Sequence, residues 1–65
     1  MERNYPQADF TNTVQGHEVW YYRFPDGWTA TILTRTDRMI LRDLHGNSSP
    51  EAASIAAKEW LDVYL

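Results

Sequence analysis

A tight turn with a defined chemistry, Phe24-Pro25-Asp26-Gly27-Trp28, most constrains how this chain folds. Proline fixes φ at the first corner, aspartate bonds its own backbone two residues on, and glycine adopts the left-handed conformation. Large or apolar residues alternate on both sides of the turn: Trp20, Tyr22 and Phe24 before it, and Trp28, Ala30 and Ile32 after it. This alternation is typical of half-buried strands. The pattern predicts a β-hairpin of strands at residues 18–24 and 28–35.

The turn also predicts the register of the hairpin. A type I turn closed by a left-handed glycine makes Phe24 face Trp28. Counting outward then pairs Tyr22 with Ala30, and Trp20 with Ile32. All these side chains fall on one face, where we expect the core.

A third strand is predicted at residues 38–44, after a tight turn at Thr36-Asp37. If Arg35 faces Arg38 across that turn, Thr34 meets Met39, Leu33 meets Ile40 and Ile32 meets Leu41. Met39 and Leu41 then join the aromatic face of the hairpin. A slip of one residue would expose that whole set of side chains.

A helix is predicted at residues 50–64. Ser49 precedes Pro50, which biases it to the extended conformation of an N-cap, and proline suits the first helical position. Glu51 lies in the first turn, where the helix dipole favours an acid, and with Ser48 it also fits a capping box. The apolar residues cover half of the helical wheel: Ala52, Ala53, Ala56, Ala57, Trp60, Leu61, Val63 and Tyr64. We therefore expect an α+β fold, a three-stranded antiparallel meander whose aromatic face packs on this helix.

The N-terminal segment 1–16 leaves two interpretations open. Pro6 excludes a helix through Tyr5-Pro6. Residues 8–14 form either a fourth, N-terminal edge strand with Phe10 tucked inward, or an extended arm that docks Tyr5 and Phe10 over the end of the core.

Length and composition indicate one domain spanning residues 1–65 and built by packing alone. The 65 residues include nine aromatic ones and no cysteine, so neither a disulfide framework nor a thiolate metal site is available. The start carries no targeting signal, and no run approaches the ~18 apolar residues of a membrane span. We expect a cytoplasmic protein without a membrane partner. The net charge of −3 argues weakly against indiscriminate nucleic-acid binding.

No catalytic constellation is apparent in the sequence. His17 and His45 are expected as exposed loop residues at opposite margins of the sheet. Asp43 and His45 are two residues apart and could point to one site, but no third ligand lies nearby. There is no glycine-rich phosphate cradle, and a chain this short has little room for a ligand-sized pocket. We predict no enzymatic activity, no cofactor and no metal.

The predicted register places a basic surface on the side of the sheet opposite the core. Four arginines would share that side with tyrosine and aliphatic residues and with no acid, which favours a partner-binding face. Its predicted members are Tyr21, Arg23, Leu33, Arg35, Arg38, Ile40 and Arg42. An ordinary solvated sheet face is the other interpretation.

The outer side of the predicted helix is acidic. Glu51, Glu59 and Asp62 lie there with Lys58 and Ile55. Lys58 and Asp62 form an i,i+4 pair worth only about 0.2–0.5 kcal/mol. This side is either a solvated face or an acidic ridge that meets a basic partner.

The segment Leu44-His45-Gly46-Asn47-Ser48-Ser49-Pro50-Glu51-Ala52-Ala53, between a meander and a helix that ends in Trp60-Leu61, resembles HicB-like antitoxin domains of the partial RNase H-like fold. In that family a glycine-polar-serine/threonine loop and a Glu-Ala pair lead into the helix. The family's usual Pro-Gly-Cys element has no counterpart here. Three strands and a helix are also similar to the arm-binding domains of phage integrases and to double-stranded-RNA-binding domains. In kind, the chain is similar to small phage-encoded anti-defence proteins of the anti-CRISPR type.

The sequence thus supports two functions of different classes. The first is a non-enzymatic module that binds and blocks another protein, as an inhibitor or antitoxin does, through the basic sheet face, the acidic helix face or both. The alternative is a nucleic-acid-binding domain that uses the basic sheet face. Homodimerisation through Leu33 and Ile40 is a third possibility.

Overall fold

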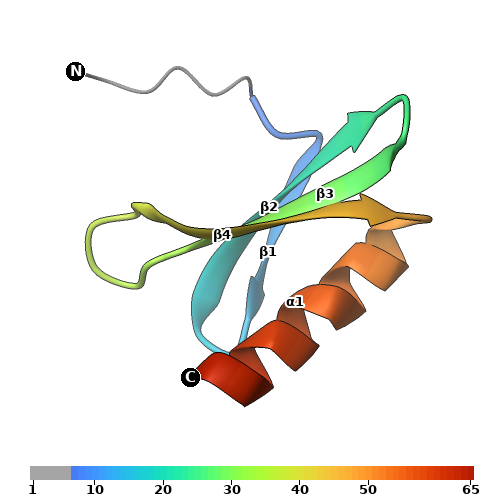
Figure 1. Cartoon of the computed structure of the whole chain (residues 1–65). Coiled ribbons are helices and arrows are strands. Elements are labelled where there is room, and N and C mark those ends of the chain that lie inside the picture. Colours follow the sequence, from blue (N-terminus) through green and yellow to red (C-terminus); the bar gives the residue numbers. More distant parts are fainter. Residues whose placement is uncertain (1–6) are drawn as a thin grey trace.

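The computed structural model describes residues 7–65 and contains a four-stranded antiparallel sheet with one helix on one of its faces (Figure 1). The elements are β1 (Phe10–Val14), β2 (His17–Phe24), β3 (Gly27–Leu33), β4 (Ile40–Asn47) and α1 (Pro50–Tyr64). The strand order β1-β2-β3-β4 follows the sequence. The α+β class is confirmed, but the sheet has four strands where the meander alone predicted three. The fourth is the N-terminal edge strand; Tyr5, which belonged to the arm alternative, lies outside the described residues.

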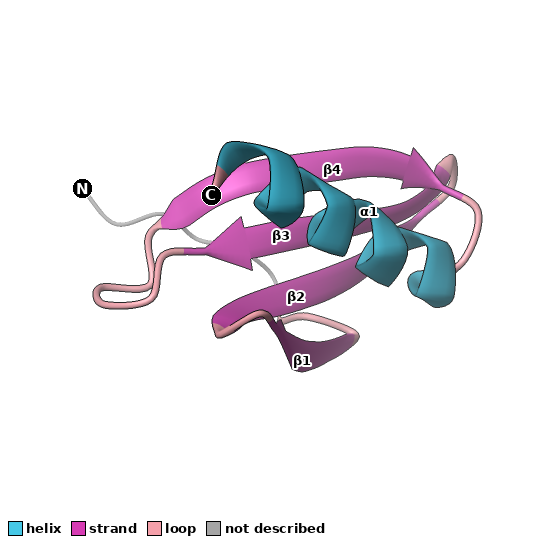
Figure 2. Ribbon diagram, turned by 90° about the horizontal axis from the view of Figure 1, so that it is seen from below, coloured by secondary structure: helices cyan, strands magenta, loops and turns pink. Residues whose placement is uncertain are grey.

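The helix begins and ends where the sequence predicts. Ser49 is the N-cap, with extended φ of −154°, and its Oγ accepts a hydrogen bond from the Ala52 N–H at 3.0 Å. Pro50 occupies the first turn. The small and apolar side of α1, with Ala53, Ala57 and Leu61 buried, packs mainly on β3 and β4. Figure 2 shows α1 lying diagonally across one face of the sheet.

The β2–β3 turn is one residue shorter than predicted. As a result, the side chains of β2 point to the faces of the sheet opposite to those predicted. Phe24 pairs with Gly27, so that Tyr21 faces Ala30 and Val19 faces Ile32. Gly27, with φ of +129°, belongs to the ladder: a Cβ added there would lie 2.6 Å from the carbonyl oxygen of Asn47 on β4. Glycine is therefore required by the close approach of β4.

The predicted core is correspondingly wrong for β2 and right for β3. Val19 and Tyr21 lie in the core, whereas Trp20, Tyr22 and Phe24 alternate to the opposite face. The buried cluster consists of Val19, Tyr21, Ala30, Ile32, Ala53, Ala57 and Leu61. Because strand side chains alternate, a register error of one residue exchanges the two faces.

Tyr21, predicted on the partner-binding face, is the largest fully buried side chain. Phe10 of β1 stacks on its ring, with centroids 4.5 Å apart and planes 17° from parallel. Its hydroxyl donates to Asn12 Oδ1 at 2.9 Å. Tyr21 therefore joins β1 to the core. Phe10 faces the core side, as the edge-strand alternative expected, but it stays 40% exposed and is not tucked inward.

Two irregularities of register shape β4. The pairing of Leu33 with Ile40 is confirmed, but Ile32 pairs with Arg42, which leaves Leu41 as an extra residue in β4. A second irregularity lies between the Trp28–Asn47 and Ala30–Leu44 pairs. Leu41 and Leu44 consequently both pack against the core although they are three positions apart. Met39, predicted in the core, is 61% exposed.

Candidate functional site

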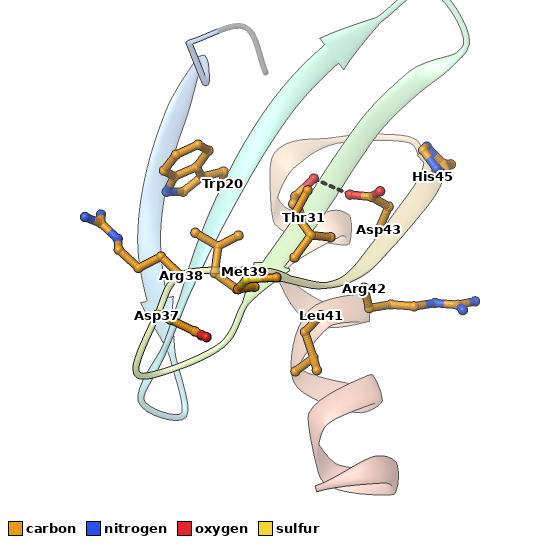
Figure 3. Close-up of a pocket in the computed structure, with 11 residues that line it drawn as sticks. Trp20, Thr31, Asp37, Arg38, Met39, Leu41, Arg42, Asp43 and His45 are labelled. Carbon is orange, nitrogen blue, oxygen red and sulfur yellow. Dashed lines mark hydrogen bonds between the residues drawn. The ribbon is translucent and has the colours of Figure 1, made fainter. Parts of the chain in front are cut away.

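A groove of about 930 Å³ opens on the face of the sheet that α1 does not cover, here called the open face (Figure 3). Trp20 of β2 stands on one side, and Asp43 and His45 of β4 on the other. Met39, from the loop that joins β3 to β4, lies at the groove. The groove thus combines aromatic, aliphatic and ionisable side chains.

The floor of the groove is β3. Thr29, Thr31 and Leu33 are only 4%, 1% and 2% exposed, although no helix lies over them. Longer side chains of the neighbouring strands enclose these residues, and among them Trp20 and Ile40 are half-buried. The open face is therefore partly packed and is not a simple solvated surface.

Two polar pairs join β3 to β4 across this floor. Thr31 Oγ1 donates to Asp43 Oδ1 at 2.6 Å, and Thr29 Oγ1 lies 3.0 Å from His45 Nδ1. Asp43 and His45 share a face, as their spacing allowed. Asp43 is hydrogen-bonded to Thr31, and His45 contacts Thr29. Within residues 7–65, no group of three or more potential ligands could hold a metal ion. The pair thus satisfies buried hydroxyls, which is a structural task.

Trp20 is held in a fixed orientation by a charged side chain. Its Nε1 donates to Glu18 Oε2 at 2.5 Å, and Arg38 Nη2 contacts the same carboxylate at 2.7 and 2.8 Å. The hydrogen bond from Trp20, followed by the hydrogen bond and charge of Arg38, lowers the pKa of Glu18 below its usual value. The indole is thereby positioned before any partner arrives.

The loop between β3 and β4 is also internally bonded. Thr34 Oγ1 donates to Asp37 Oδ1 at 2.6 Å and accepts from the Met39 N–H at 3.0 Å. The threonine hydrogen bond is the main cause that lowers the pKa of Asp37. Thr34 N–H also donates to the Met39 carbonyl at 2.8 Å, as the predicted Thr34–Met39 pairing implied. These bonds present the thioether of Met39 to solvent.

The predicted single basic face does not exist. Arg38 pairs with Glu18, and Figure 3 shows Arg42 extending in the opposite direction. The Arg35 guanidinium lies beside Gly16, 3.4 Å from where a Cβ would stand. Arg23 belongs to the Tyr21 row of β2, because alternate residues of a strand share a side. Of the predicted set, Leu33, Arg38, Ile40 and Arg42 line the groove, and this face also carries acids, since Glu18, Asp37 and Asp43 are there.

The predicted acidic helix face is exposed at Glu51 and Glu59. Asp62 is exposed too, but it accepts a hydrogen bond from Gln15 Nε2 at 2.6 Å and pairs with Lys58 Nζ at 3.3 Å. These two contacts, the Gln15 bond first, lower the pKa of Asp62. Asp62 therefore links α1 to the β1–β2 turn. Ile55, 57% exposed, interrupts the acidic surface.

The histidines are not loop residues. His17 opens β2, and its Nδ1–H donates to the Leu33 carbonyl at 3.1 Å, since a carbonyl oxygen can only accept. His45 lies within β4 and is exposed. The hydrogen bond of His17 joins β2 to β3, and the contact of His45 with Thr29 joins β4 to β3.

Comparisons with known proteins return no relative. No protein-family model matches the chain, and no curated protein or solved structure is significantly similar to it. In the part of the chain that the structure describes, no helix has the length and apolar character needed to span a membrane.

Proposed function

We propose that this chain is a non-enzymatic, cytoplasmic protein-binding module that blocks its partner by covering part of the partner's surface. The observation that carries the proposal is the groove of the open face, with an oriented Trp20, an exposed Met39, and Leu33 and Ile40 among its lining residues. Aromatic side chains fixed before binding lose little entropy on association, and methionine adapts to the shape of a partner. Both are typical of interface anchors.

The groove suits a protein segment with an apolar anchor next to an acidic residue. The half-buried Ile40 and the exposed Met39 offer the apolar surface that an aliphatic or aromatic side chain would cover. Arg42 lines the groove and is exposed, and its guanidinium makes no ion pair or hydrogen bond with residues 7–65. A carboxylate of the partner would complement it, at a cost in desolvation that an exposed arginine keeps small.

The nucleic-acid alternative loses the argument that favoured it. It required four arginines on one face. Of these four, only Arg38 and Arg42 line the groove, where acids lie with them, and Arg38 is already paired with Glu18; Arg35 lies beside Gly16. No other observation favours phosphate binding. The side chains that line the groove therefore favour protein binding.

The test is capture of a partner with groove variants. A bacterial lysate is the first source, because the chain resembles HicB-like antitoxins and phage-encoded anti-defence proteins. The captured protein is then titrated with the wild type, with Met39→Glu, and with Ile55→Glu as a matched control. Both replaced side chains are exposed, but Ile55 lies on α1. We expect Met39→Glu to weaken binding by about tenfold or more and Ile55→Glu to leave it unchanged.

The opposite pattern, with loss in Ile55→Glu alone, would exclude the groove as the binding site. Amide spectra recorded with added duplex or single-stranded nucleic acid at low salt test the alternative directly. Shifts that disappear steeply as salt is added would establish phosphate contacts and overturn the proposal.

A further inference from the structure

The two edges of the sheet differ in how they are protected against pairing with another strand. β4 is long, but two irregularities of register interrupt it and Arg42 projects from it. Bulges and charges are the devices that keep edges from pairing. β1 has neither: its five residues, Phe-Thr-Asn-Thr-Val, carry no charge and no proline and pair with β2 without interruption.

The backbone of β1 presents its free groups at two threonines. Val14 and His17 close a two-residue turn in which Gln15 and Gly16 both have positive φ, as in a type I′ turn. The closing pair of such a turn is hydrogen-bonded, and bonded pairs then alternate along the ladder. The N–H and C=O groups of Thr11 and Thr13 therefore point away from β2, and nothing within residues 7–65 pairs with them.

We propose that β1 is a self-association edge, at which two copies of this chain pair β1 to β1 in antiparallel fashion about a two-fold axis at Asn12. This register uses every outward backbone group of the strand, because Thr11 of one copy faces Thr13 of the other and each threonine N–H meets a threonine C=O. Two-fold axes through Thr11 or Thr13 would leave part of these groups unpaired. A C2 interface must be self-complementary in this way.

The side chains match in the same register. Phe10 of one copy faces Val14 of the other on the helix side of the sheet; Phe10 is 40% exposed and Val14 is half-buried in the monomer. Thr11 and Thr13 form matched pairs on the open face. Asn12 Oδ1 accepts the hydrogen bond of the Tyr21 hydroxyl. The Asn12 Nδ2 group of each copy can then donate to the Asn12 side chain of the other copy.

The assembly joins two four-stranded sheets into one continuous sheet with both helices on the same side. Figure 2 shows β1 at the margin of the sheet, and among the elements of residues 7–65 only β2 pairs with it. The open faces of the two copies become one surface. The inference is independent of the proposed function, since it concerns the edge of the sheet and leaves the groove unoccupied.

Sedimentation equilibrium of the full chain, from micromolar to millimolar concentration, tests this assembly. We expect the apparent mass to rise from 7.6 kDa towards twice that value. Two variants test the register. Thr11→Lys/Thr13→Lys places like charges opposite each other and should weaken the dimer by about tenfold. Thr11→Glu/Thr13→Lys places opposite charges there and should restore it. Both threonines are exposed, and in both variants the lysine at position 13 faces Glu18 of β2, so the two variants have the same charge contact between β1 and β2.

Hydrogen exchange supplies a second measurement. The Thr11 and Thr13 amides should gain protection as concentration rises, whereas the Asn12 amide, already paired with β2, should change little. A chain that sediments as a monomer up to its solubility limit would overturn the proposal. Two charged variants that weaken the dimer equally would overturn the Asn12-centred register.

Discussion

The two sides of β3 are buried by different means. On one side, Ala30 and Ile32 are covered by α1 and belong to the buried apolar cluster. On the other side, Thr29 and Thr31 are buried almost as completely, without any layer above them. Their burial depends on cross-strand side chains and on hydrogen bonds to Asp43 and His45.

This difference shows how a small sheet can leave one face accessible to a partner and still be stable. Packing against the helix gives non-directional stabilisation that grows with the apolar area buried. The open face relies on directional contacts between matched polar groups, which fail abruptly when one partner is lost. The two sides of β3 should therefore respond differently to substitution.

The largest effect is expected on the helix side. Leu61→Ala removes a nearly fully buried side chain from the core and should lower the free energy of unfolding by about 2–5 kcal/mol. Urea unfolding followed by circular dichroism measures it. Ile55→Ala, an aliphatic truncation on the exposed side of the same helix, is the control and should cost less than about 0.5 kcal/mol. Equal losses in the two variants would mean that α1 is not packed as described.

An intermediate effect is expected on the open face. Thr31→Val keeps the shape of the side chain but leaves the half-buried Asp43 carboxylate without its donor, which should cost about 1–3 kcal/mol. The double variant Thr31→Val/Asp43→Ala should lose less than the sum of the two single variants, because both partners are then absent. Strictly additive losses in a double-mutant cycle would show that the 2.6 Å contact stabilises nothing.

The smallest effect at neutral pH is expected for Glu18→Gln, which changes the residue that binds Trp20 and Arg38 of the groove. The folded-state pKa of Glu18 is lowered by the Trp20 and Arg38 contacts. The stability that it contributes is therefore present above the ordinary carboxyl pKa and is lost as pH falls through the lowered value. Glu18→Gln should flatten that part of the acid-unfolding profile.

The carboxyl carbon shift of Glu18, followed by NMR against pH, measures the lowered pKa directly. Glu59→Gln changes the same charge on α1, away from the groove, and is the matched control. A Glu18 titration at the ordinary glutamate value would mean that the carboxylate does not hold the indole in solution.

The sequence predicted those parts of the fold whose signals are local. Ser49 and Pro50 define the start of α1 through their own backbone preferences, so the helix bounds were correct. The position of the β2–β3 hairpin was also correct. Its register was not, because β2 carries bulky apolar residues on both faces, and adjacent Tyr21 and Tyr22 fit either one. The deciding constraint on Gly27 comes from Asn47, twenty positions away, and no turn rule contains it.

The candidate site was missed for the same reason. The open face carries Trp20 of β2, where the predicted register had placed Tyr21. The irregularities of β4 bring Asp43 and His45 opposite Thr31 and Thr29. One signal was available in the sequence: the Thr29-x-Thr31 and Asp43-x-His45 pairs have the same spacing. Matching polar residues across the strands gives the observed pairing of Thr31 with Asp43. Hydrophobic alternation alone does not, because bulges interrupt the period of two.

The contact between Gln15 and Asp62 joins residues 47 positions apart, whereas each strand pairs with its immediate neighbour in the chain. Every hairpin thus closes a short loop, and short loops form quickly at small entropic cost. Docking of the helix end on the first turn requires nearly the whole chain to be in place. We therefore expect the strands to assemble from local encounters, and the arrival of the helix to be the late event that makes folding all-or-none.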